Sequence, residues 1–198
     1  MQKVSELPLK STIEETTQAL DLRGAELPQF IGIDENSTLR GNNLSLFALK
    51  SFLAIARSRL EGTNPRVSLI KTEAADVVFV SFRGRGFSTT EQELLFTEAL
   101  PTRRDLFDIL DYKSLEAYET DAKREKIFDR QIPENMRLTI AKSLIEDQSG
   151  QIGLVSEPMG AVLYFAVPKE GAEISRATMN EAKKWALNER NQVIEGKQ

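Results

Sequence analysis

Two pairs of apolar, strand-like runs constrain the fold of this chain most strongly. The first pair covers residues 66–71 and 77–82, and the second covers residues 152–156 and 161–167. Short turn-forming stretches connect the runs within each pair, so each pair is predicted to form a β-hairpin. The run from Val77 to Phe82 is rich in β-branched and aromatic residues, which is typical of a strand near the centre of a sheet.

Helical patterns lie before, between and after these hairpins. Apolar residues recur every three or four positions over residues 42–60, which is the strongest helical signal in the chain. Other segments predict a short strand near residues 30–34 and helices near residues 11–22, 88–96, 134–147 and 174–193. The stretch from Ser88 to Glu91 has the spacing of a capped start for the second of these helices. This order of elements predicts an α+β fold, a two-layer sandwich in which helices cover one face of a mixed sheet.

The composition is that of a globular domain, and it excludes several kinds of chemistry. The sequence has 198 residues, of which 40% are hydrophobic, and it contains no cysteine and no histidine. A core of ordinary size is therefore expected. Disulfides, thiol nucleophiles, the usual His/Cys zinc sites, a Ser-His-Asp triad and a phosphoaccepting histidine are excluded for this sequence.

The charge balance bears on the partners. There are 26 basic and 30 acidic residues, a net charge of −4, and no block of Lys or Arg. This balance argues against nucleic acid or an anionic membrane as the main partner. The apolar runs are far shorter than the roughly 20 residues of a membrane-spanning helix, and the first residues lack the apolar stretch of a signal peptide. We expect a soluble, cytoplasmic protein.

The segment from Arg137 to Pro168 carries a resemblance to a known family. A helix, a turn at Gly150 and the second hairpin follow one another there in a distinctive order and spacing. This segment resembles the end of the ATP-binding domain of sensor histidine kinases, the Bergerat or GHKL fold that they share with gyrase. The resemblance covers about residues 4–168. It implies a kinase-like domain over residues 1–170, followed by a C-terminal helix and tail over residues 171–198.

The resemblance aligns the helix at residues 42–60 with the N-box helix of the family. The family has two asparagines four residues apart in this helix, and the second binds Mg²⁺. Here those positions are Phe52 and Ala56, and neither can coordinate a cation that needs oxygen ligands. The basic residue of the family three positions further on matches Arg59, which implies that one positive charge near the phosphates is kept.

The first glycine box of the family aligns with residues 77–87. The family places an adenine-binding aspartate two residues before a Gly-x-Gly sequence. Here Phe82 stands at that position, and Arg83, Gly84, Arg85 and Gly86 follow it. The glycines are kept and the adenine-binding carboxylate is absent. We expect Phe52 and Phe82 to fill the former adenine cavity as core residues; a stacking platform for another ligand is the alternative.

The second glycine box of the family, where backbone N–H groups at a helix start bind phosphate, aligns with residues 133–137. This stretch, Pro133, Glu134, Asn135, Met136 and Arg137, contains no glycine. Pro133 removes one N–H donor, and the Glu134 carboxylate would repel phosphate from the helix terminus.

The losses together weigh against nucleotide binding. Hydrogen bonds to charged groups contribute about 1.5 to 3 kcal/mol each, so the loss of three such interactions costs roughly 5 to 8 kcal/mol. A micromolar site has about 8 kcal/mol of binding energy, and the remainder corresponds to millimolar affinity or weaker. We therefore expect no bound cofactor and no metal ion.

Three further features leave alternatives open. Four arginines, Arg57, Arg59, Arg83 and Arg85, either line the former nucleotide cleft and bind another anion or are solvated. The helical insert at residues 101–132, where kinases carry a lid over ATP, either contacts a protein partner or folds back over the cleft. Trp185 in the C-terminal helix either anchors a partner or packs on its own domain.

The sequence thus predicts a degenerate, pseudokinase-like domain that acts through protein contacts in two-component signalling or regulation. Its partner by analogy is a histidine kinase or a response regulator; the oligomeric state, including a homodimer, is left open. The first alternative is a divergent GHKL ATPase or kinase domain that binds ATP and Mg²⁺ in a shifted geometry, through Arg59, Gly84, Gly86 and the lid. The second is a small-molecule or anion sensor that uses the remodelled cleft.

Overall fold

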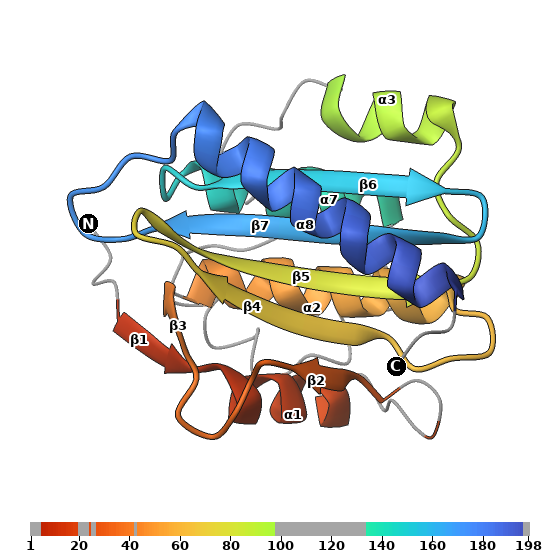
Figure 1. Ribbon diagram of the computed structural model, residues 1–198, viewed down its shortest axis with the longest axis horizontal. Coiled ribbons are helices and arrows are strands. Elements are labelled where there is room, and N and C mark those ends of the chain that lie inside the picture. The colour runs from red at the N-terminus through yellow and green to blue at the C-terminus, as the bar shows by residue number, and fades with distance from the viewer. Residues whose placement is uncertain (1–4, 20–23, 25–26, 42, 98–133, 196–198) are drawn as a thin grey trace, which may run out of the picture.

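A mixed five-stranded sheet is the centre of the fold. The computed structural model describes residues 5–19, 24, 27–41, 43–97 and 134–195. The strands lie in the order β2-β4-β5-β7-β6 (Figure 1). They are β2 (Gln29–Ile31), β4 (Arg66–Lys71), β5 (Ala75–Arg83), β6 (Gln151–Glu157) and β7 (Gly160–Pro168). Strand β2 runs parallel to β4, and the other neighbouring strands are antiparallel.

Both predicted hairpins are confirmed. Strand β4 pairs with β5, and β6 pairs with β7. The hairpins join where β5 pairs with β7, with Val78 opposite Phe165. Only the last residue of β5 and of β7 is not fully buried, as predicted for a central strand over residues 77–82.

One face of the sheet is covered by α1 (Leu9–Ala19), α2 (Asn43–Arg59) and α7 (Glu134–Glu146). Their apolar residues form a buried cluster with the residues of β5 and β7 that point to this side. The short helix α3 (Thr89–Thr97) contacts α7. The predicted α+β sandwich is therefore confirmed.

The other face of the sheet is covered by α8 (Arg176–Glu195), which crosses the strands in front of the sheet in Figure 1. A second buried cluster joins Ala182 and Ala186 of α8 to Phe79 and Tyr164 of the sheet. The prediction did not assign the C-terminal helix to this face. The residues of β5 and β7 that point away from α2 are also apolar, so this face needs a cover too, and α8 adds a third layer.

A small second sheet was not predicted. Strand β1 (Ser5–Pro8) pairs antiparallel with β3 (Thr38–Gly41) beside α1. Both strands are short and neither has an apolar alternation, so the local sequence gives no strand signal. The predicted strand at residues 30–34 is shorter than expected, because Gly32 has a φ of 68° and the chain turns there.

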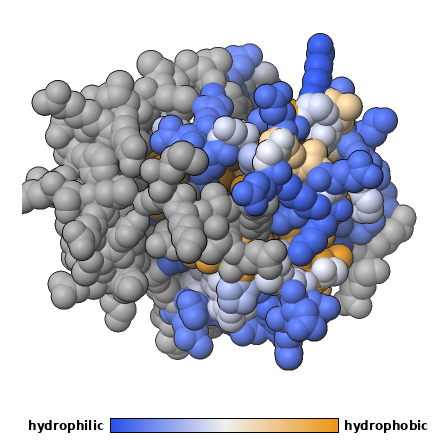
Figure 2. Space-filling view, turned by 90° about the vertical axis from the view of Figure 1, so that its left-hand side faces the viewer, coloured by the Kyte–Doolittle hydropathy of each residue, from blue (hydrophilic) through white to orange (hydrophobic). Residues whose placement is uncertain are grey.

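Polar residues predominate on one face of the described residues, and apolar ones show in small areas between them (Figure 2). No helix in the described part of the chain is long and apolar enough to cross a membrane. The predicted insert at residues 101–132 lies outside the described residues, and the division at residue 170 stays a prediction.

Candidate functional site

The positions aligned with the ligand-binding residues of the N-box and the first glycine box lie together in the core. Phe52, Ala56 and Phe82 each have 0% of their surface exposed and belong to one apolar cluster between α2, α7 and the sheet. The Phe52 ring packs edge-on against Phe165, with 5.8 Å between the ring centroids. These side chains offer no polar atom to a ligand.

Arg59, at the end of α2, is the cation that the resemblance places near the phosphates. Its Nη1 donates to the Gly86 carbonyl at 2.8 Å, and its Nη2 donates to Glu91 Oε1 at 2.8 Å. The guanidinium carbon also lies 3.9 Å from the centroid of the Phe87 ring, which is a cation–π contact. The side chain is 8% exposed, so these internal groups surround most of the guanidinium.

Glu91 joins this cation to the start of α3. Its Oε2 accepts a hydrogen bond from the Ser88 N–H at 2.7 Å, and its own N–H donates to Ser88 Oγ at 3.2 Å, which is a capping box. Arg85, whose side chain is 70% exposed, also donates to Glu91 Oε1 at 3.0 Å. The hydrogen bond from Arg59 is the main reason that the pKa of Glu91 falls to about 2, and the backbone N–H of Ser88 adds to it.

The glycines of the first box are needed where backbones approach closely. A Cβ atom on Gly84 would lie 2.0 Å from the Arg59 carbonyl oxygen, and one on Gly86 would lie 1.7 Å from the Glu157 carbonyl oxygen. The N–H groups of Gly84, Arg85 and Gly86 donate to protein carbonyls at 2.9 to 3.2 Å. This segment therefore connects the end of α2 to the β6–β7 hairpin, and its backbone donors already have partners.

The other predicted site residues do not converge on one point. Phe82 points to the α2 side of β5, so the next residue, Arg83, points to the other side. The Arg57 side chain is exposed. In α7, Arg137 is 8% exposed, and Asn135 lies in the first turn of the helix; Pro133 is outside the described residues. The structure thus brings Arg59 and Arg85 together on Glu91 and leaves Arg83 apart.

Sequence reasoning missed three contributors to this site. It used Glu91 only as a signal for the start of a helix, and it assigned no role to Phe87 or Ser156. The Phe87 N–H donates to Ser156 Oγ at 2.7 Å, which holds the chain ahead of α3 against β6. The Ser88-x-x-Glu91 spacing correctly predicted the cap, but no local pattern pairs Glu91 with an arginine 32 residues away.

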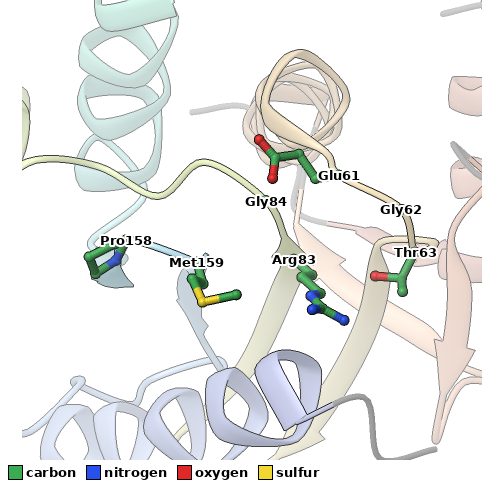
Figure 3. Close-up of a pocket in the computed structure, with 7 residues that line it drawn as sticks. All are labelled: Glu61, Gly62, Thr63, Arg83, Gly84, Pro158 and Met159. Atoms are coloured by element: carbon green, nitrogen blue, oxygen red, sulfur yellow. The ribbon is translucent and has the colours of Figure 1, made fainter.

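A separate cavity of about 420 Å³ lies at the end of the sheet where β5 ends. Figure 3 shows its lining, which comes from the turn after α2, the end of β5 and the β6–β7 turn. The lining residues are Glu61, Gly62, Thr63, Arg83, Gly84, Pro158 and Met159. No group of three or more acidic residues among the described parts of the chain is arranged to hold a metal ion.

Solved structures with a similar arrangement of elements include histidine kinases and the catalytic domain of one of them. The Acinetobacter baumannii histidine kinase AdeS superposes with a TM-score of 0.58 at 11% identity, over 86% of this chain and 70% of that chain. The nucleotide-free catalytic domain of histidine kinase ThkA gives a TM-score of 0.57 at 15% identity, over 85% and 97% of the two chains. The chain has the fold of a histidine kinase ATP-binding domain.

The mycobacterial sensor histidine kinase MprB extends this likeness. Its structure gives a TM-score of 0.55 at 13% identity, over 84% of this chain and 97% of that chain. No family model and no curated protein matches the sequence. At such low identity the similarity of this chain to histidine kinase ATP-binding domains shows only a shared fold, and the function must be argued from the site.

Proposed function

We propose that this chain is a non-catalytic, histidine-kinase-like domain that does not bind ATP in the manner of the family and acts through protein contacts. The observation that carries the proposal is the burial of Phe52, Ala56 and Phe82 in one apolar cluster. These residues stand at the positions that the resemblance assigns to the metal and the adenine. Their side chains do not fit either ligand, since Mg²⁺ requires oxygen ligands and adenine requires a hydrogen-bond acceptor.

The surroundings of Arg59 support the same conclusion for the phosphates. To bind a phosphate, this guanidinium would have to leave the Glu91 carboxylate and the Gly86 carbonyl, both at 2.8 Å. An internal carboxylate already supplies the negative charge that a phosphate would bring. The site is thus electrostatically satisfied without a ligand, and exchanging one anion for another gains little free energy.

A domain of this kind acts by binding another protein. By analogy, that partner is a histidine kinase or a response regulator in two-component signalling. Four large apolar side chains are exposed among the described residues: Leu27, Ile31, Met159 and Trp185. Trp185 is 46% exposed on α8, and tryptophan is enriched in the energetic centres of protein interfaces. We propose this side of α8 as part of the contact surface.

Hydrogen exchange with and without millimolar Mg²⁺-ATP tests the nucleotide part of the proposal. Ligand binding in the family mode would slow exchange in α2, in α7 and at the end of β5, because a ligand stabilises the segments that it contacts. We expect unchanged exchange in all three. Slower exchange there would instead support the divergent ATPase or kinase domain.

The contact part is tested by titration of the labelled chain with purified response regulators and with dimerisation domains of histidine kinases. Saturable binding that Trp185→Ala weakens supports the proposal. The matched control is Lys183→Ala, an exposed position two residues before Trp185 that the helical repeat places on a different side of α8. Binding that is equally strong in the Trp185→Ala variant would contradict the assignment of this surface.

A further inference from the structure

The cavity at the end of β5 has the size of a small-molecule site. Its volume of about 420 Å³ falls in the range of roughly 300 to 1,000 Å³ that is usual for such sites. Three turns that are distant in sequence contribute its walls: residues 61–63, 83–84 and 158–159. It is thus formed by the tertiary structure and is not a gap within one loop.

The walls of this cavity are held in place by the backbone. The Glu61 N–H donates to the Arg83 carbonyl at 2.9 Å, and the Gly84 N–H donates to the Met159 carbonyl at 3.1 Å. Leu60 forms an additional bridge with Gly84. Since these bonds connect all three turns, the cavity is preorganised, which lowers the entropic cost of binding a ligand.

Two polar groups of the cavity have no partner among the residues that the structure describes. Neither the Arg83 guanidinium nor the Thr63 hydroxyl has a hydrogen bond or ion pair to any residue in the described parts of the chain. In this respect Arg83 differs from Arg59 and Arg85, which both pair with Glu91. Both side chains are partly buried, so each has lost some of its contact with water.

The close-up in Figure 3 shows how these groups are directed. The side chains of Arg83, Thr63 and Met159 border the same space, and the Glu61 carboxylate points away from Arg83. The thioether of Met159 and the ring of Pro158 form the apolar side of the cavity. A ligand here would meet a cation and a hydroxyl at one end and apolar atoms at the other.

We propose that this cavity binds a small carboxylic acid that carries an apolar group. The planar fork of a guanidinium matches a carboxylate, and the Thr63 hydroxyl can donate a further hydrogen bond to it. The flexible, polarisable side chain of Met159 suits an alkyl group. Among the described lining residues Arg83 is the one cation and Glu61 the one anion, so a singly charged carboxylate is favoured over a phosphate dianion.

This site shares Arg83 and Gly84 with the first glycine box, but the Arg83 side chain lies on the other face of β5 from the cluster that fills the nucleotide cleft of the family. Phe82 points into the cluster below α2, whereas Arg83 points to the opposite side of β5. The inference therefore goes beyond the proposed function and does not depend on it. ATP binding in the cleft would contradict the proposed function, whereas the binding of a carboxylate in this cavity is tested by its own titration.

The test is an NMR titration of the full ¹⁵N-labelled chain with hexanoate, with hexanamide as the neutral control. We expect saturable shifts at the backbone amides of Gly62, Thr63 and Gly84 with the acid and none with the amide. Arg83→Gln is expected to weaken binding about tenfold or more, because it removes a charge-assisted, two-point hydrogen bond. Arg85→Gln removes the same charge two residues away and is expected to leave binding unchanged.

Thr63→Val is a second variant of the same cavity, which tests the proposal even if Arg83→Gln does not fold. It keeps the shape of the side chain, removes the hydroxyl and is expected to weaken binding of hexanoate severalfold with an otherwise unchanged spectrum. The proposal is overturned if hexanoate gives no saturable shifts at millimolar concentration. Equal binding of acid and amide, or equal weakening by Arg83→Gln and Arg85→Gln, would overturn it as well.

Discussion

The Arg59 guanidinium and the Glu91 carboxylate form an ion pair of 2.8 Å between the end of α2 and the start of α3. Arg59 is 8% exposed and the Glu91 side chain is 30% exposed, so the pair is only partly in contact with water. The same carboxylate caps α3 and pairs with Arg85. One residue of the chain thus takes the place that an anionic ligand would occupy beside Arg59.

Glu91→Gln is expected to lower the free energy of unfolding by about 1 to 3 kcal/mol, because it removes the carboxylate that pairs with the mostly buried Arg59 guanidinium at 2.8 Å. Chemical denaturation at neutral pH measures the loss. Arg85→Gln is the matched control, since it removes the exposed partner of the same carboxylate, and it should cost at most about 0.5 kcal/mol. Equal losses in the two variants would contradict the assigned roles.

The pH dependence of stability gives a second readout of this pair. The folded-state pKa of Glu91, about 2, lies below the ordinary value of 4.5. A lowered folded-state pKa stabilises the protein fully above the ordinary value, and that stabilisation disappears as the pH falls toward the folded-state value. The difference in unfolding free energy between the wild type and Glu91→Gln should therefore shrink as the pH falls from 4.5 toward 2.

Gly86→Ala is expected to destabilise the fold severely, by about 3 kcal/mol or more, because its Cβ would lie 1.7 Å from the Glu157 carbonyl oxygen. Thermal unfolding measures the loss. The control is Gly171→Asn, at a turn with open space and a φ of 71° that asparagine tolerates, and it should change little. A stable Gly86→Ala protein would show that the two backbones can separate. Because a Cβ atom at Gly84 or Gly86 would collide with the backbone, a variant of either glycine that no longer binds a nucleotide would indicate misfolding, not the loss of a contact between the glycine and the nucleotide.

Phe52→Ala is expected to reduce the free energy of unfolding by about 3 to 5 kcal/mol, since it leaves a cavity beside Phe165 in the cluster under α2. The conservative Phe52→Leu should cost less than about 1.5 kcal/mol. Denaturant titration of both variants checks the prediction. A small effect of Phe52→Ala would mean that this region of the protein is not a packed core.

Glu189→Leu is expected to strengthen the attachment of α8 at neutral pH. Glu189 is 8% exposed, and its Oε2 has no hydrogen-bond partner among the described residues. Burial raises its pKa above 4.5, although Arg66 opposes the shift. The protonated carboxyl of Glu189 suits this buried position better than the ionised one. Its contribution to the stability of the folded protein is therefore complete below the pKa of the unfolded chain and is lost as the pH rises through the raised pKa of the folded protein.

Fluorescence of Trp185, the only tryptophan of the sequence, reports on α8 during denaturation at several pH values. The free energy of unfolding of the wild type should fall as the pH rises and Glu189 ionises. In Glu189→Leu this fall should be absent. Glu181→Gln, at an exposed position of the same helix, is the control and should follow the wild type. A steeper dependence in Glu189→Leu would contradict the role given to burial.

Much of the fold could be predicted because its signals are local. The apolar run of β5, the periodicity of α2 and the turns of the two hairpins follow from neighbouring residues. Strands β1 and β3 could not be predicted, since each is short and its residues pair with residues 30 or more positions away. The face that α8 covers depends on the alternation of β5 and β7, which the sequence shows, and on the path of the chain after β7, which it does not.

In the candidate site, too, some features could be predicted from the sequence and others could not. Phe52 and Phe82 were expected to fill the former adenine cavity as core residues, because both are apolar within a helix and a strand that the sequence predicts. The contact of Arg59 with Glu91 depends on two flexible side chains from separate helices, and the cavity at Arg83 depends on three turns that meet only in the folded chain. No spacing along the sequence indicates either.

The central claim, that the site of the family no longer accepts a nucleotide, is tested most directly by calorimetric titration of the chain with Mg²⁺ and a non-hydrolysable ATP analogue up to millimolar concentration. The account predicts no saturable heat, in the wild type and in Arg59→Gln alike. Saturable heat with a micromolar dissociation constant, weakened by Arg59→Gln in a protein that remains folded, would contradict it.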